Sequence, residues 1–475
     1  MINRYSDGRQ FISLQQKKQS SSMMINIQIL LKIFVALFVI ILFFLGKIDF
    51  INLIGILFVC FAIDLTIPFL FKNLFLIYTL ILFLVGGLLF LRHHNDISLD
   101  MLGYLSSFII GYWFLKIIRK DKTRIDCPIY TVATNKIDDI YMTLSKHFLV
   151  FSCIIQLSLW LGMIIHYGIL NYYAGVFLVN SIHVYGKENL AWGGLLLFSN
   201  FINAISFSSF VLYSVRSFKV YQRISLFLPS IALILIPLLE MNRSACAIGF
   251  FLFLILIYLN DRERSYSLYI LGLTSLVVVI FIVFIIGLIR QNALTHHSRL
   301  GLTKGIAFQL LTEELTGIKT YYTIKKNIGI LKYQYGKTII FPMLFQFIPR
   351  SWMPDKPLNS AGYFNQKLYP SQASAGFYAS PPIFGDLYLN FGYWGSLCFI
   401  FLLGMYWSSL DTVLVKHNNK KLAQILFSYY FFYPILRGGL EGPGAIMFYT
   451  WIIYLFLQAF IYGLSKAVYY YENSN

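Results

Sequence analysis

Long apolar runs make up most of the chain, and polar segments interrupt them only briefly. A run of about twenty apolar residues is the length that an α-helix needs to cross the hydrocarbon core of a bilayer. Only a helix or a closed barrel satisfies its own backbone there. The pattern therefore predicts an all-α membrane protein with twelve spanning helices, at residues 25–46, 50–71, 73–91, 98–118, 147–170, 191–215, 225–241, 244–260, 267–289, 382–410, 422–437 and 445–465.

One polar segment is much longer than the others. Residues 290–381 carry eleven Lys and Arg side chains against three acidic ones, a net charge of +8. Apolar residues recur at helical spacing within 302–330, which predicts an amphipathic helix. Three prolines at 349, 354 and 357 exclude a continuous helix after it. We expect one large, mainly helical loop.

Composition agrees with a membrane location. Hydrophobic residues make up 58% of the chain and charged residues only 12%, too few to cover a soluble protein of this size. A net charge of +18 would indicate nucleic-acid binding in a soluble protein, but basic cytoplasmic loops account for about half of the basic residues. We expect no nucleic-acid partner. The five cysteines are scattered, without a CxxC pair or a His/Cys cluster, so we expect neither a metal nor another cofactor.

Basic residues favour one set of alternate loops. Twenty of them lie in the N-terminal tail, at 72, in 119–146, 216–223, 262–264 and 416–421, and at 466, against five in the opposite short loops. The positive-inside rule then places both termini in the cytoplasm, and a loop as long as 290–381 escapes the rule. The first apolar run reads as an uncleaved anchor, with Met23 or Met24 as alternative starts to Met1. The expected organisation is a cytoplasmic tail (1–24), nine spans (25–289), the outer loop (290–381), three spans (382–466) and a second cytoplasmic tail (467–475).

Six charged residues from four places in the chain lie at the predicted outer ends of spans: Glu240, Arg243, Arg290, Asp386, Arg437 and Glu441. Ionisable groups at such depths are costly and are usually paired or functional, although arginine also anchors span ends. Arginine suits phosphate because its planar group donates two hydrogen bonds and keeps its charge. Three arginines at one level predict a pyrophosphate site whose lipid tail lies in the bilayer. The glycine-rich turn 437–444 could add backbone donors, or simply be a tight turn.

The proline-rich segment of the loop offers a second candidate region. Its stiff backbone would present Arg350 and Lys356 to a second phosphate or to a glycan, with Trp352 as a platform for a sugar. The alternative for the loop's lysines is a solvated face on a lid.

Three motifs resemble the O-antigen and capsule repeat-unit polymerases, the Wzy family. They are Asn-Arg-Ser at 242–244, Phe-Ile-Pro-Arg-Ser-Trp-Met-Pro-Asp-Lys-Pro at 347–357 and Gly-Asp-Leu-Tyr-Leu-Asn-Phe-Gly-Tyr-Trp-Gly at 385–395. The family pattern commonly has Glu where this chain has Asp386. The resemblance implies an architecture related to GT-C membrane glycosyltransferases. It also implies transfer of a growing glycan from undecaprenyl pyrophosphate onto a lipid-linked repeat unit, at the outer face of the bacterial inner membrane, with a chain-length co-polymerase as partner.

The expected chemistry assigns roles to these residues. A sugar hydroxyl of the acceptor attacks the anomeric carbon of the donor while pyrophosphate leaves. Arg243, Arg290 and Arg437 would stabilise the developing phosphate charge, and a carboxylate would take the proton. Asp386 is the first candidate for that base and Glu441 the second, and each is an equally good candidate for orienting an arginine. No external Asp-x-Asp motif indicates a metal-bound nucleotide sugar.

Three other functions fit the pattern less well. An O-antigen ligase would use the same donor with a lipid A-core acceptor, which the sequence does not distinguish. A flippase or other transporter of lipid-linked oligosaccharides commonly has internal repeats of spans, and we recognise none here. A membrane scaffold without activity is the remaining alternative.

Overall fold

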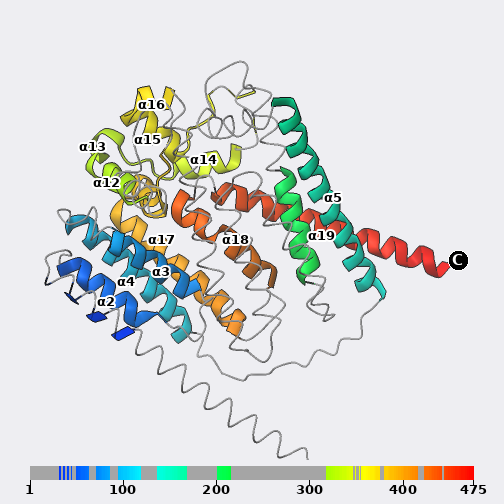
Figure 1. The fold of residues 1–475 in the computed structure, drawn as a ribbon, viewed down its shortest axis with the longest axis horizontal. Helices are drawn as coiled ribbons and strands as arrows, with labels where there is room; N and C mark the ends of the chain where they lie inside the picture. Colours follow the sequence, from blue (N-terminus) through cyan, green and yellow to red (C-terminus); the bar gives the residue numbers. More distant parts are fainter. Residues whose placement is uncertain are drawn as a thin grey trace, which may run out of the picture. The chain divides into compact units, whose positions relative to one another are not determined.

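A computed structural model describes residues 32–33, 36–37, 40–41, 44, 50–63, 71–85, 95–118, 136–167, 201–215, 317–345, 348, 352–353, 355–374, 379–415, 422–440 and 443–474. This part of the chain is all-helical, as predicted, and it contains no strand (Figure 1). Its helices are α2 (Phe50–Ala62), α3 (Phe71–Val85), α4 (Asn95–Ile118), α5 (Lys136–Tyr167), α12 (Ile318–Lys326), α13 (Ile328–Leu331), α14 (Lys337–Phe345), α15 (Ser360–Leu368), α16 (Pro370–Ser374), α17 (Ile383–Val415), α18 (Leu422–Gly438) and α19 (Pro443–Ser474), with a further helix at Phe201–Val215.

Four of the described helices are long and apolar enough to cross a membrane. Four shorter apolar helices coincide with other predicted spans: Phe50–Cys60, Lys72–Phe83, Phe201–Val215 and Leu422–Phe432. The predicted spans at 225–241, 244–260 and 267–289 lie outside the described residues, as does most of 25–46. The chain is thus a helical membrane protein in its described part, while the number of twelve spans stays a prediction. The four long candidates are Asp96–Ile118, Lys136–Gly162, Ile383–Val413 and Ile446–Asn473.

The chain divides into two compact units. The first contains Met1–Asp121 and Leu397–Asp411, and the second contains Lys122–Ser396 and Thr412–Asn475. In the first unit α4 and α17 touch through their backbones. A Cβ atom on Gly111 would lie 2.1 Å from the carbonyl oxygen of Phe401, and one on Gly404 would lie 2.3 Å from that of Phe108. Small residues permit this close approach between membrane helices, where packing rather than water drives association.

A buried carboxylate joins three helices of the first unit. Asp411 on α17 is 2% exposed, and its Oδ2 accepts hydrogen bonds from the Lys72 backbone N–H (3.2 Å) and the Tyr112 hydroxyl (2.9 Å). The first N–H groups of a helix have no partner within the helix, so Asp411 satisfies one of them at the start of α3. Its role is accordingly structural.

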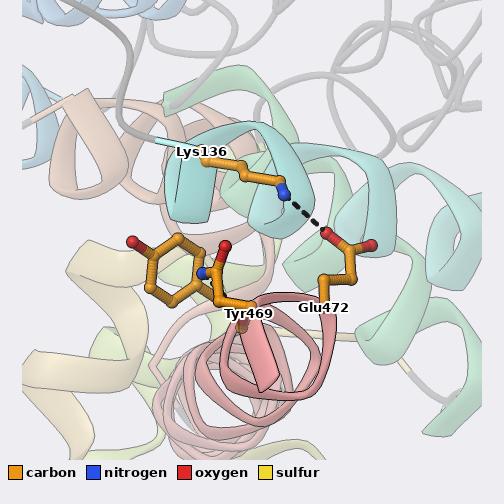
Figure 2. A network of polar contacts seen from close by, with 4 residues as sticks. Lys136, Tyr469 and Glu472 are labelled. Atoms are coloured by element: carbon orange, nitrogen blue, oxygen red, sulfur yellow. Dashed lines mark hydrogen bonds and ion pairs between the residues drawn. The ribbon is translucent and has the colours of Figure 1, made fainter. Parts of the chain in front are cut away.

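In the second unit, the start of α5 lies beside the end of α19. The Lys136 ammonium and the Glu472 carboxylate form an ion pair of 3.1 Å between these two ends (Figure 2). Both helices are candidate spans, so two spans paired in this way would place the chain before α5 and the C-terminal tail on the same side of a membrane. The predicted topology requires this common side, and its assignment to the cytoplasm stays a prediction.

The described part of the large loop is mainly helical, from α12 to α16. Helix α12 is amphipathic, because Ile318, Tyr321 and Ile324 are buried while Lys319 and Lys326 are exposed. The prediction of one continuous helix over 302–330 is wrong, because α12 begins after Gly317, whose φ is 63°, and ends before Asn327. Residues 302–316 of the predicted helix lie outside the described residues. Between α14 and α15 the described residues are non-helical, as the prolines predicted, and the Asn359 side chain caps α15 by accepting the N–H of Gly362 (2.8 Å).

Candidate functional site

Asp386 lies in the first turn of α17, where the loop enters a candidate span. Its side chain is 0% exposed, so it lies inside the protein. The first turn is the positive end of the helix dipole, which favours a negative charge. Burial of a carboxylate is nevertheless costly unless hydrogen bonds replace its water.

Within the described residues, three donors bind this carboxylate. Oδ1 accepts from the Ser360 hydroxyl (2.5 Å) and from Nδ2 of Asn390 (3.2 Å), and Oδ2 accepts from the backbone N–H of Leu440 (2.8 Å). Hydrogen bonds to an ionised acceptor are stronger than those between neutral groups. The Asp386 carboxylate therefore connects α15, α17 and the turn that follows α18.

Thr338 extends these contacts to α14. Its hydroxyl lies 2.8 Å from the Ser360 hydroxyl and 2.9 Å from Oδ1 of Asn390. Because a hydroxyl has a single hydrogen, Thr338 donates to one of these two oxygens at a time, while Ser360 donates to Asp386. We call Asp386, Ser360, Asn390, Thr338 and the Leu440 N–H the Asp386 network. All four side chains are buried.

The glycine-rich turn after α18 closes tightly over Asp386. Gly439 has φ +75°, the left-handed conformation that commonly ends a helix. A Cβ atom on Gly439 would lie 2.7 Å from Oδ2 of Asp386, so only glycine fits here without displacement. The N–H of Leu440 in this turn binds the Asp386 carboxylate. The backbone N–H of Leu440 therefore binds a side chain of the protein itself.

Arg437 lies in the last turn of α18 and is half-buried. Its Nη1 donates a hydrogen bond to the Ser380 carbonyl (3.1 Å), and a Cβ atom on Gly317 would lie 3.3 Å from it. The Asn365 side chain holds the neighbouring Ala379 by its N–H (3.1 Å) and its carbonyl (2.9 Å). The segment that leads into α17 therefore orients the Arg437 guanidinium.

Of the predicted site residues, the structure brings together Asp386 and the turn that begins at Arg437. Trp352 is 82% exposed, which leaves its ring accessible. The Lys356 ammonium donates to the Ile348 carbonyl (3.1 Å), so this hydrogen bond joins two positions of the same proline-rich segment. The predicted residues Arg243, Arg290, Arg350 and Glu441 lie outside the described residues.

Sequence reasoning missed three members of the Asp386 network. Asn390 had a usable signal, because it follows Asp386 by one helical turn within a candidate span, where polar side chains are unusual. Ser360 and Thr338 had none. Hydroxyl residues are ordinary in a polar loop, and only the fold shows that these two are buried beside a carboxylate.

No family model, no curated protein and no solved structure matches this chain. A function is therefore inferred from its own residues and their geometry.

Proposed function

We propose that the protein is a membrane glycosyltransferase that polymerises lipid-linked glycan repeat units. It would transfer a growing glycan from undecaprenyl pyrophosphate onto a lipid-linked repeat unit at the outer face of the bacterial inner membrane. The observation that supports this most is the Asp386 network, which ties two loop helices to the ends of two apolar helices beside Arg437. A lipid-linked substrate has its reacting phosphate at that level of a membrane.

The residues divide the chemistry between them. Arg437, with Arg243 and Arg290, would neutralise the leaving pyrophosphate. A general base must reach the proton that it removes, whereas Asp386 is 0% exposed and binds three donors. These contacts favour an orienting role for Asp386. The base is then Glu441, which directly follows the residue whose N–H Asp386 holds.

The wider proposal follows the sequence pattern. Twelve spans with cytoplasmic termini would place the loop outside, in an architecture related to GT-C glycosyltransferases. Trp352, Arg350 and Lys356 would line the path of the glycan on the loop. A co-polymerase partner would set the length of the chain.

Gel profiling of surface polysaccharide from a deletion strain tests this function. The proposal predicts surface glycan of a single repeat unit, and long polymer after complementation with the intact gene. Long polymer that stays on the lipid carrier would indicate a ligase, and repeat units confined to the cytoplasmic leaflet would indicate a flippase.

Complementation with Arg437→Lys sharpens the test at the residue level. Lysine keeps the charge but loses the two-pronged donor geometry, so we expect shorter polymers at unchanged membrane levels of the protein. Lys367→Arg is the matched control, because Lys367 is an exposed side chain of α15 and should tolerate the exchange. Wild-type polymer lengths with Arg437→Lys would refute the assignment of Arg437 to pyrophosphate.

A further inference from the structure

We infer that α14 is a membrane-interface helix whose outer face lies among lipid acyl chains. The outer face consists of Ile340, Phe341 and Leu344, which are 53%, 41% and 57% exposed. Their spacing places them on one side of the helix. The inner side carries Thr338, which belongs to the Asp386 network, and Ile339, both buried. This inference goes beyond the proposed function, because it holds whatever reaction the site performs.

The start of α14 is anchored to α17 within a candidate span. The N–H groups of Gln334 and Tyr335 donate to the carbonyls of Leu389 (3.0 Å) and Asn390 (2.8 Å). In a regular helix these carbonyls would accept from residues 393 and 394. The non-helical backbone of Gly392 (φ 68°, ψ −175°) interrupts that pattern. Leu389 lies six residues into the span Ile383–Val413, or about 9 Å along the helix axis.

The end of α14 is anchored to α19. The Tyr449 hydroxyl contacts the carbonyls of Met343 (2.5 Å) and Leu344 (2.9 Å), which lie in the last turn of α14 and have no partner within it. Tyr449 lies three residues into the span Ile446–Asn473, or about 5 Å along its axis. Both ends of α14 are therefore held at the level of the first two turns of two candidate spans.

Apolar side chains exposed at that level face lipid. On α19, Phe448 and Ile452 flank Tyr449 at helical spacing and are 43% and 47% exposed. The residues at the start of α14 suit a headgroup region, because Tyr335 is 78% exposed and Lys332 and Lys337 are exposed. Tyrosine favours membrane–water interfaces, and lysine favours anionic lipid surfaces.

Site-directed spin labelling tests this inference in full-length protein. Ile340→Cys and Leu344→Cys would be labelled in a cysteine-free background and reconstituted into phosphatidylethanolamine–phosphatidylglycerol liposomes. Phe456→Cys on α19, 68% exposed within its span, is the lipid reference, and Gln366→Cys, exposed on α15, is the water reference. Power saturation then measures how often the spin label at each position collides with lipid-soluble oxygen and with a water-soluble nickel chelate.

We expect the oxygen-to-nickel accessibility ratio at 340 and 344 to exceed that at 366 several-fold and to lie below that at 456, because 456 is ten residues into its span and therefore deeper. A ratio like that at 366 would overturn the inference. Protection from both reagents would also overturn it, because a second copy or another protein would then cover the face. A phospholipid with a photoreactive acyl chain gives a second readout in the unmodified protein. It should label residues 337–345, and labelling of 446–473 without 337–345 would contradict the inference.

Discussion

At Asp386 one carboxylate binds donors from three different elements: Ser360 on α15, Asn390 on α17 and the backbone N–H of Leu440 after α18. Each donor left without its acceptor in this buried place would cost about 1–3 kcal/mol. The carboxylate thus fixes the turn that carries Arg437 on one side and Glu441 on the other. The proposed function therefore gives Asp386 an orienting role.

Asp386→Asn separates the two roles. An amide oxygen can still accept the N–H of Leu440, so we expect an initial polymerisation rate within about one order of magnitude of wild type. Loss of a general base costs about 10²–10⁴-fold in rate, which is the loss we expect for Glu441→Gln. Asp386→Ala removes both carboxylate oxygens, so we expect it to abolish activity and to lower the melting temperature strongly. Rates would be measured on purified protein with lipid-linked repeat units.

The opposite ranking would contradict this division of roles. If Asp386→Asn lost 10²-fold or more while retaining the thermal stability of wild type, Asp386 would be the base.

Gly439→Ala tests how closely the turn approaches the carboxylate. The left-handed backbone alone costs a non-glycine residue about 1–2 kcal/mol, and its Cβ atom would meet Oδ2 of Asp386 at 2.7 Å. We expect a lower melting temperature and a large loss of activity. Gly463→Ala on α19 is the control, because nothing lies within 4 Å of its Cβ position and alanine favours a helix by about 0.5–1 kcal/mol. Equal effects of the two substitutions would argue against the turn geometry.

Among the elements, α17 depends on a single break in its backbone. The conformation of Gly392 is accessible almost only to glycine, and it coincides with the two hydrogen bonds that hold the start of α14. Gly392→Ala should straighten α17, release Gln334 and Tyr335, and destabilise the protein by about 1–3 kcal/mol. Denaturation in detergent would measure this, with Gly162→Ala in α5, whose Cβ position is open, as the control. Unchanged stability with Gly392→Ala would contradict the anchoring of α14.

The helices themselves were largely predictable, because long apolar runs and helix-breaking prolines act locally. The pattern predicted α4, α17, α18 and α19 with shifts of a few residues at most of their ends. It missed the early start of α5 at Lys136, where a polar first stretch precedes the apolar run and contacts α19. It also missed the kink at Gly392, because a glycine within an apolar run is compatible with a regular helix.

The site was predictable only in part, for a different reason. Charge at a span end marks Asp386 and Arg437 from sequence, since such placement is costly. The pairing of Asp386 with Leu440 joins positions 54 residues apart, and an N–H donor is common to nearly every residue. Its partner could not be recognised before the fold was known.

For the whole molecule, the ion pair between Lys136 and Glu472 predicts a common side for two distant segments. The pair itself should contribute little, about 0–1 kcal/mol, because both side chains are about half exposed. Single cysteines at 136 and 472 should react with a membrane-impermeant maleimide only after the membrane is opened, whereas one at Gln366 should react in intact cells with a permeable outer envelope. Labelling of 136 and 472 from opposite sides would contradict the packing of α5 against α19.

A membrane polymerase must bring a lipid-linked substrate to a protein site at the bilayer surface. Helix α14 has one face for each of these partners. Its inner face joins the Asp386 network, and its outer face is apolar and exposed. With its outer face among acyl chains, as we infer, the same helix would connect the proposed site to the membrane.

Reconstitution tests the central claim most directly. Purified full-length protein in liposomes would receive a single lipid, undecaprenyl pyrophosphate carrying one repeat unit, and the products would be separated by gel electrophoresis. The proposed function predicts a ladder of glycans that increase by one repeat unit per step, with release of undecaprenyl pyrophosphate. A substrate that remains a single repeat unit, with folded protein present in the liposomes, would contradict it.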